Sequence, residues 1–154
     1  MSEWKETELG KIPTSWNIYK VNELVKMNIL EKPLDGNHGE IHPKQSDFLK
    51  SGIPFIMASD LVNGRLKLDS CKFISKRQAD SLRKGFSLKG DVLLTHKATL
   101  GRTAIVGDIH FSYIVLSPQV TYYRVLDKTK LYNKFLKYYF DSNIFQETLF
   151  NYAS

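Results

Sequence analysis

The most regular pattern of hydrophobic and polar positions lies in the middle of the chain, in the segment KGDVLLTHKATLGRTAIV at 89–106. Its two apolar runs, at 92–94 and 104–106, are typical of strands that pack inside a sheet. Glycine, threonine and cationic residues separate the two runs and favour a turn. The pattern therefore predicts a β-hairpin whose basic turn stands on a rigid base and can donate hydrogen bonds to an anionic partner.

Shorter apolar runs on either side of this hairpin predict further strands. We expect an extended entry strand over 12–21, a short helix over 21–27 and a strand over 52–57. The Asn63-Gly64 pair predicts a tight turn that leads into a strand at 65–68. The remaining strands are expected at 71–74, 111–116 and 119–126.

Three capping patterns predict helices in the rest of the chain. Ser75 followed by Gln78 is a capping-box arrangement, and Gly85 fits a C-terminal cap, so a helix is expected over 76–84. Asp127 and Ser142 are the expected N-caps of two further helices. The apolar stripes of these two helices, which we expect to pack on the sheet, are Leu131, Phe135, Tyr139, Phe145, Leu149 and Tyr152.

Residues 31–51 are rich in Pro, Gly, Asp, Asn and Ser and predict a long structured loop, which in a compact domain usually has a function. One hypothesis is a metal-dependent nuclease, because carboxylate and imidazole ligands can hold a metal that activates water. Gly39 and Pro43 interrupt the helix on which paired histidines usually lie, so a hydrogen-bonded loop is the simpler interpretation. The candidate ligands are Asp35, His38, Glu40, His42 and Asp47.

Composition indicates one folded domain. The chain has 154 residues, of which 42% are hydrophobic, enough to form a core and too many for a disordered segment. Its single cysteine, Cys71, excludes an internal disulfide and a site built from several thiolates. The sequence contains no apolar run of about 18 residues, and its polar beginning does not resemble a secretory signal. We therefore expect a cytoplasmic protein without a membrane span.

Positive charge is concentrated in one quarter of the chain. The net charge is +6, but residues 65–102 alone have ten Lys and Arg against three Asp and Glu, a net charge of +7. This concentration predicts a surface patch for an anionic partner, most commonly nucleic acid, although a solvated basic surface is the alternative. Lys76 and Arg77 fall in the first turn of the expected helix, where the helix dipole disfavours cations unless an anion lies nearby.

Five segments carry a resemblance to a known family, in the family's order and approximate spacing. They are IPTSWNIYKVNEL, DGNHGEIHP, GIPFIMASDL, GDVLLTHKATLGRTAIV and LSPQVTYYRVL. Together they resemble the DNA target-recognition domain of a type I restriction-modification specificity subunit. In that family, two such domains alternate with long helices, each domain reads one half of a split target, and the helices bind methyltransferase subunits.

The resemblance implies a single α+β target-recognition domain over 1–154, with a strongly twisted mixed β-sheet core, short helices and C-terminal helices. Only one such domain is present, and the family's spacer helix is absent, so the chain resembles half of a subunit. A fragment, a natural half-subunit that forms a homodimer and a truncated product all fit this pattern. A third class of function, a protein-interaction module that uses the aromatic C-terminal helices, also stays open.

The resemblance further implies sequence-specific binding of double-stranded DNA without catalysis. Motifs for methyl transfer and for ATP binding are missing from the sequence, so S-adenosylmethionine, ATP and Mg²⁺ are expected on the partner methyltransferase and restriction subunits. The side chains expected to contact the DNA backbone are Lys97, Arg102, Lys76, Arg77 and Lys44. Those expected to read bases are Asn37, His38 and Gln119, with Arg102 shared and His96 and Thr99 completing the basic turn.

Overall fold

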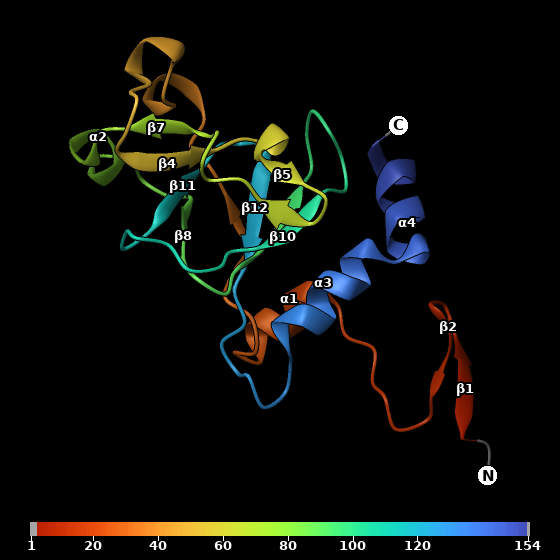
Figure 1. Ribbon diagram of the computed structural model, residues 1–154. Helices are drawn as coiled ribbons and strands as arrows, with labels where there is room; N and C mark the ends of the chain where they lie inside the picture. Colours follow the sequence, from red (N-terminus) through yellow and green to blue (C-terminus); the bar gives the residue numbers. More distant parts are fainter. Residues whose placement is uncertain (1–2, 154) are drawn as a thin grey trace.

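Two four-stranded sheets form the centre of the molecule, whose computed structural model describes residues 3–153 (Figure 1). In the first sheet the order is β10-β9-β12-β3, and all neighbouring strands are antiparallel. In the second sheet the order is β7-β4-β11-β8, with β4 and β11 parallel and the other pairs antiparallel. The expected α+β class with a mixed β-sheet core is therefore confirmed.

The strands of these sheets are short. Those of the first sheet are β3 (Leu34–Asp35), β9 (Val92–Thr95), β10 (Thr103–Ile105) and β12 (Val120–Tyr123). Those of the second sheet are β4 (Ile53–Ile56), β7 (Lys72–Ile74), β8 (Phe86–Ser87) and β11 (Ile114–Leu116). Two separate hairpins complete the strands, β1 (Trp4–Thr7) with β2 (Gly10–Pro13) and β5 (Leu61–Val62) with β6 (Arg65–Leu66).

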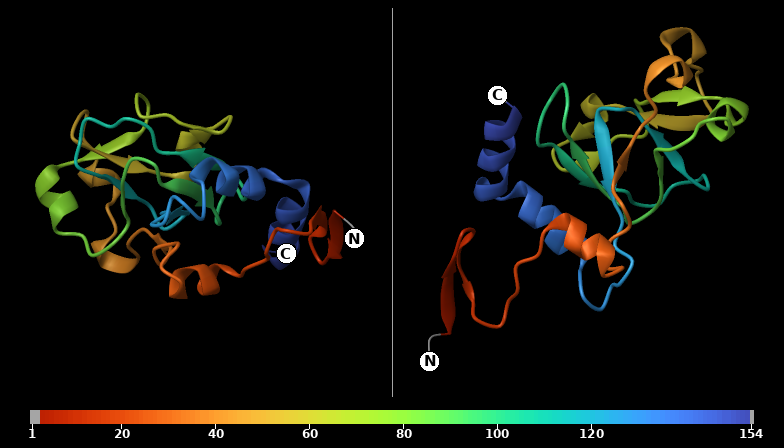
Figure 2. Two further views of the ribbon diagram at one scale, coloured as in Figure 1. Left: turned by 90° about the horizontal axis from the view of Figure 1, so that it is seen from below. Right: turned by 180° about the vertical axis from the view of Figure 1, so that it is seen from behind.

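Helices surround the sheets. The α-helices are α1 (Val21–Lys26), α2 (Lys76–Asp80), α3 (Asn133–Asp141) and α4 (Asn143–Ala153). Three single 3₁₀ turns are η1 (Gly39–Ile41), η2 (Gln45–Asp47) and η3 (Ala58–Asp60). Helix α2 lies at one end of the sheets, whereas α3 and α4 lie at the other end, between the sheets and the projecting β1–β2 hairpin (Figures 1 and 2). Within residues 3–153, no helix is long and apolar enough to cross a membrane.

The inner strands are buried on both faces, as their continuous apolar runs require. All residues of β4, β9 and β11 are buried. Strand β12 instead alternates, with Val120 and Tyr122 buried while Thr121 and Tyr123 stay partly exposed. The sequence pattern alone left open which face of this strand is inside.

The expected entry strand over 12–21 is wrong in its extent. Strand β2 ends at Pro13, and residues 16–20 have no regular structure. The preceding residues form strand β1 instead, because Gly10 adopts a left-handed φ of +96° and the Thr7 hydroxyl donates to its carbonyl at 2.7 Å. Thr7 and Gly10 therefore form the tight turn between β1 and β2. Little in the sequence indicates this turn, because it lacks the Asn-Gly or Asp-Gly pair typical of a two-residue hairpin turn.

The helix expected over 76–84 ends earlier, at Asp80. Its N-cap is confirmed, since Ser75 Oγ accepts the Gln78 N–H at 3.0 Å. The end differs because the N–H groups of Arg83 and Lys84 donate to the side chain of Asn37. A distant side chain thus replaces the helical acceptors that the local sequence predicts.

The start of α3 also differs from the expectation. Asp127 accepts the Thr129 N–H at 3.0 Å within a turn, and the helix begins only at Asn133. The buried side chains of this helix are Leu136 and Phe140, whereas Phe135 is 46% exposed and contacts the Trp16 ring. Ser142, by contrast, is confirmed as the residue before α4, and its hydroxyl accepts the Phe145 N–H at 3.3 Å.

Candidate nucleic-acid interface

The basic turn at 96–102 joins β9 to β10, and Thr95, the last residue of β9, forms hydrogen bonds to the second half of the turn. The Thr95 hydroxyl accepts the Arg102 N–H at 3.0 Å and donates to the Thr99 carbonyl. The N–H of Gly101 donates to the Thr95 carbonyl at 3.0 Å, and Ala98 and Gly101 have left-handed φ values of +63° and +80°. The predicted hairpin with a basic turn is therefore confirmed, and its base is the buried β9 strand.

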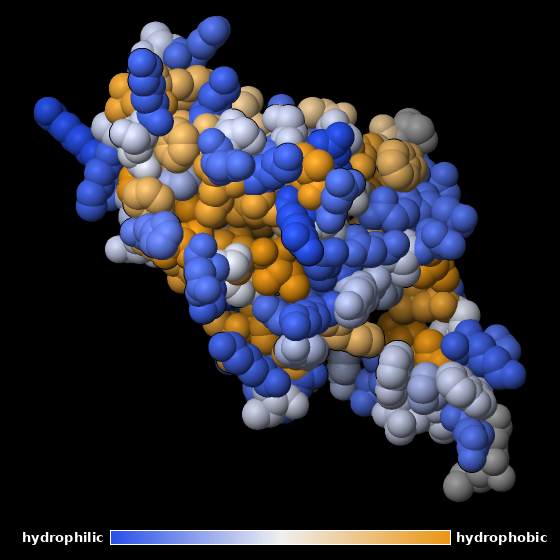
Figure 3. All heavy atoms as spheres, in the orientation of Figure 1, coloured by the Kyte–Doolittle hydropathy of each residue, from blue (hydrophilic) through white to orange (hydrophobic). Residues whose placement is uncertain are grey.

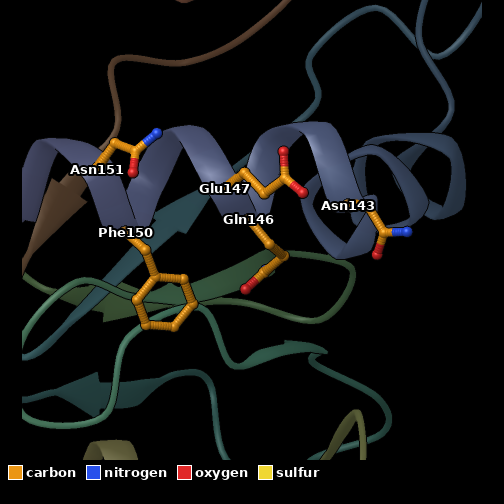
Figure 4. A pocket seen from close by; sticks show the side chains of 5 residues that line it. All are labelled: Asn143, Gln146, Glu147, Phe150 and Asn151. Atoms are coloured by element: carbon orange, nitrogen blue, oxygen red, sulfur yellow. The ribbon is translucent and has the colours of Figure 1, made fainter.

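A side chain from α4 fixes the far end of this turn. Gln146 Nε2 donates to the carbonyls of Gly101 at 3.0 Å and Phe140 at 2.7 Å. A Cβ at position 101 would lie 2.2 Å from Gln146 Oε1 and would displace this side chain, and the left-handed φ of Gly101 also favours glycine there. Figure 4 shows Gln146 and Phe150 pointing from α4 toward the strands and loops below it. Sequence reasoning missed Gln146, because nothing local signals a contact across 45 residues.

The shallow hollow drawn in Figure 4 offers little for a ligand. It has a volume of about 380 Å³ and is lined by α4 alone, through Asn143, Gln146, Glu147, Phe150 and Asn151. Gln146 already uses its amide group to hold the turn. We therefore place the candidate interface at the basic turn rather than at this shallow hollow.

A charged cluster lies where the turn leaves β9. Asp35 accepts Lys84 Nζ at 2.5 Å through Oδ1 and His38 Nε2 at 3.0 Å through Oδ2. His96 Nε2 is buried and lies 3.9 Å from the same Oδ2, too far for a hydrogen bond. Burial would raise the pKa of Asp35, but hydrogen bonds and charge from Lys84 and His38 outweigh it and lower this pKa. The cluster therefore joins His38 and His96, predicted separately, around one carboxylate.

Three of the predicted DNA-binding side chains on the turn, Lys97, Thr99 and Arg102, are exposed to solvent. Lys97 and Thr99 are exposed, and Lys97 lies close enough to His96 to lower the pKa of the imidazole. Arg102 is also exposed, with its Nη1 donating to the Leu61 carbonyl at 3.3 Å. Cations on both ends of the turn are thus presented to solvent.

Asn37 does not have the position that base reading requires. Its side chain is buried, at 3% exposure, and Nδ2 donates to the Lys84 carbonyl at 2.8 Å. Its Oδ1 accepts the N–H groups of Arg83 and Lys84 at 3.0 and 3.3 Å. Both ends of the amide serve the fold, so we correct this prediction and assign Asn37 to the support of the loop after α2.

Gln119 already uses one atom of its amide group within the fold. Its Oε1 accepts the Ala58 N–H at 3.1 Å, whereas bidentate reading of adenine needs both the oxygen and the nitrogen of the amide. Its backbone carbonyl accepts the His96 N–H at 3.1 Å, so the residue still supports the start of the basic turn.

The remaining predicted cations lie far from the turn. Lys76 and Arg77 are on α2, at the opposite end of the sheets from the turn (Figures 1 and 2). Lys76 Nζ pairs with Asp80 at 2.6 Å. Lys44 is near this end as well, because its N–H donates to Asp47 at 2.8 Å and Gln78 on α2 bonds the same carboxylate. The basic segment 65–102 is therefore not one continuous patch.

The loop at 31–51 does not gather its candidate metal ligands. Asp35 is occupied by Lys84 and His38, Asp47 by the Lys44 N–H, and the His42 ring packs 5.6 Å from that of Phe55. In the described part of the chain, no group of three or more His, Cys, Asp or Glu side chains could hold a metal ion. The nuclease hypothesis is not favoured.

The aromatic helices are used mainly inside the protein. Of the six residues expected in their stripes, four pack against the cluster that contains Leu136 and Phe140: Leu131, Tyr139, Phe145 and Leu149. Phe135 and Tyr152 remain exposed, and hydrophobic atoms are visible between these helices and the N-terminal hairpin (Figure 3). Packing against the sheet is thus their main use, as expected.

The sequence is similar to one curated protein over almost its whole length. The type I restriction enzyme MjaIX specificity subunit of Methanocaldococcus jannaschii is 24% identical over 150 residues, which is 96% of this chain. The match covers 32% of the relative, so the chain spans about a third of its length. No protein-family model matches the sequence.

Two solved structures share the fold. The HsdS subunit from Thermoanaerobacter tengcongensis superimposes with a TM-score of 0.59 and 18% identity over 82% of this chain and 28% of that chain. A chain from a study of complex assembly and conformational transition of the type I R-M system superimposes with a TM-score of 0.60 and 18% identity, over 84% of this chain and 28% of that chain. These matches confirm the resemblance to a domain of a type I specificity subunit, and with it the fold.

Proposed function

We propose that this chain, similar in sequence and fold to part of type I specificity subunits, is a DNA target-recognition domain that reads one half of a bipartite target. The observation that carries the proposal is the basic turn at 96–102, which is held on a buried strand and presents Lys97 and Arg102 to solvent. Preformed cationic turns suit DNA, because phosphate contacts supply much of the affinity while base contacts supply specificity.

The roles of individual side chains follow from their positions. Lys97 and Arg102 contact phosphates, and Arg102 or His38 can also meet a base edge. His96 and Thr99 shape the turn between them, while Lys76, Arg77 and Lys44 would meet DNA only where a duplex extends to α2. The domain itself supplies recognition and not catalysis.

The whole complex would supply the chemistry. Methyltransferase subunits would bring S-adenosylmethionine, and a restriction subunit would bring ATP and Mg²⁺, directed by this domain to their target in the cytoplasm. Exposed aromatic side chains on α3 and α4, among them Phe135, Tyr138 and Tyr152, offer a surface for such partners or for a second copy of the chain.

Salt-dependent DNA binding tests the proposal. The affinity of the chain, with its partner subunits, for duplex DNA is measured by fluorescence anisotropy between about 50 and 200 mM salt. We expect the affinity to fall steeply with salt, and Lys97→Ala and Arg102→Ala each to reduce the slope of log K against log salt by roughly 0.9. Lys89→Ala is the matched control, since this exposed lysine pairs with Asp108 outside the turn. Absent or salt-insensitive binding by the intact complex would contradict the proposal.

The target itself can be read in cells. We expect cells with the whole system to carry a methylated, bipartite DNA motif, detectable by sequencing that reports adenine methylation. Lys97→Ala should leave the sequence of this motif unchanged, because a phosphate contact carries no sequence information, whereas Arg102→Ala should relax the base preference in one half only.

A further inference from the structure

A polar hollow of about 520 Å³ lies beside the basic turn, between the β5–β6 hairpin and α3. Its walls contain two cationic side chains from distant parts of the chain, Arg102 at the end of the turn and Lys137 on α3. Its other polar side chains are Asn63 at the tip of the β5–β6 hairpin, Thr103 on β10 and one carboxylate, Asp141. The hollow therefore has two possible donors for one anionic group, from two separate elements.

Both cations lie against the β5–β6 hairpin. Arg102 Nη1 donates to the carbonyl of Leu61 on β5 at 3.3 Å, which fixes one edge of the guanidinium group. Lys137 Nζ lies over the tip of the hairpin, where a Cβ on Gly64 would come within 3.1 Å of it. Gly64 has a left-handed φ of +75°, so glycine serves both the turn and the approach of Lys137. Charges that are already positioned lose little conformational freedom when an anion arrives.

Asp141 determines how much charge Lys137 presents. Its Oδ2 lies 2.7 Å from Lys137 Nζ, and its Oδ1 accepts the hydroxyl of Thr103 on β10. The carboxylate is thus held at the wall while it partly neutralises the lysine. An ammonium group has three donors, so Lys137 can keep this carboxylate and still donate to a second anion.

We propose that this hollow binds a phosphodiester group of the DNA backbone, with Arg102 and Lys137 as its donors and Asp141 as a carboxylate that weakens the site. The inference rests on the proposed DNA-binding function and adds to it a cation outside the basic segment 65–102. It also predicts that one substitution in the hollow strengthens binding, because removal of the carboxylate leaves the two cations unopposed.

Three variants of the full chain test the site, each compared with the unmodified protein by salt-dependent anisotropy on the same duplex. Lys137→Ala should bind about eightfold more weakly at 0.1 M salt and lose roughly 0.9 from the salt slope, as expected for one phosphate contact. Asp141→Asn should bind more tightly and with a steeper slope, while its amide oxygen still accepts the Thr103 hydroxyl. Lys134→Ala removes the same charge one helical turn away, outside the hollow, and should leave the DNA affinity and the salt slope nearly unchanged.

Thermal unfolding of each variant separates binding from folding. If Lys137→Ala fails to fold, Lys137→Met keeps the apolar stem of the side chain and removes only the charge. The inference would be overturned if Lys137→Ala and Lys134→Ala changed the DNA affinity equally. It would also be overturned if the folded Asp141→Asn variant bound DNA more weakly, because the Lys137–Asp141 pair would then only support the fold. Inorganic phosphate bound through Lys137, with DNA binding unchanged in the Lys137 variant, would assign the hollow to free phosphate instead. Absence of DNA binding by the unmodified protein together with its partner subunits would reject the proposed function itself.

Discussion

His96 lies where the basic turn leaves β9, and its surroundings favour the neutral imidazole. Burial lowers the pKa of His96; the charge of Asp35 opposes this effect, while Lys97 and His38 add to it. The pKa of His42 is lowered as well, by burial and by the charge of His38. The imidazole of His96 therefore stays neutral to a lower pH than an ordinary histidine does.

A pH-dependent loss of stability follows from His96. Because its folded-state pKa is lowered, the unfolded chain binds more protons near pH 6.5, so this contribution to stability is present above that pH and is lost as pH falls. The unfolding free energy is measured by urea titration at pH 7.5 and at pH 5.5. We expect its decrease between the two pH values to be smaller in His96→Gln than in the unmodified chain. His110→Gln, at an exposed histidine, should keep the full decrease. The same decrease in all three proteins would show that His96 does not contribute.

At the scale of elements, the C-terminal helices and the basic turn form one unit. Three side-chain contacts join these helices to the β9–β10 hairpin that carries the turn: Asn133 Nδ2 donates to the Gly90 carbonyl before β9, the Thr103 hydroxyl on β10 donates to Asp141, and Gln146 donates to the Gly101 carbonyl in the turn itself. No residue of α4 is buried in the described chain. This helix contacts the turn through the hydrogen bond from Gln146 to the Gly101 carbonyl. The position of α4 thereby affects how the turn is presented.

Loss of Gln146 should loosen the turn. Gln146→Ala leaves the carbonyls of Gly101 and Phe140 without this donor, and we expect a loss of about 1 to 2 kcal/mol in unfolding free energy. Hydrogen exchange should become faster in residues 96–102, where the Gly101 N–H is protected by Thr95. Glu147→Ala, at the next position of the same helix, is the control. Unchanged exchange in the turn would mean that Thr95 alone determines its order.

At the scale of the whole molecule, Arg124 connects the two sheets. From the end of β12 in the first sheet, its Nε and Nη2 donate to Asp91 at 2.9 Å, and Nη1 donates to Glu31 at 2.7 Å. Nη2 also donates at 3.0 Å to the carbonyl of Phe86 on β8 in the second sheet. Asp91 is 1% exposed and additionally accepts the Ser87 hydroxyl and the Leu88 N–H.

Removal of this arginine should weaken the whole fold. Arg124→Met leaves the carboxylate of Asp91 buried without its cation, and we expect the unfolding free energy to fall by roughly 3 to 5 kcal/mol. Denaturant titration followed by circular dichroism measures the loss. Lys89→Met breaks an exposed ion pair with Asp108 and should leave stability nearly unchanged. A similar small effect of both substitutions would show that Asp91 is satisfied by Ser87 and Leu88 alone.

Local sequence determined the elements whose signals lie within a few residues. The apolar runs around the basic turn, the Asn63-Gly64 pair and the Ser75 cap all form the structures that they predict, because turn geometry and strand burial depend mainly on neighbouring residues. The five ordered segments also indicated the family, and the comparisons confirm that resemblance.

Only the tertiary structure decided what the polar side chains do. Asn37 and Gln119 have the residue types that read bases, but their amides bond backbone groups that lie 46 and 61 residues away. Lys76 and Lys97 belong to one basic stretch of sequence, yet helix α2, which carries Lys76, and the β9–β10 turn, which carries Lys97, lie at opposite ends of the sheets. Lys137, outside that stretch, reaches the hollow beside Arg102. Hydrogen bonds and charges act over a few ångströms in space, so their partners are set by the folded chain and not by distance along the sequence.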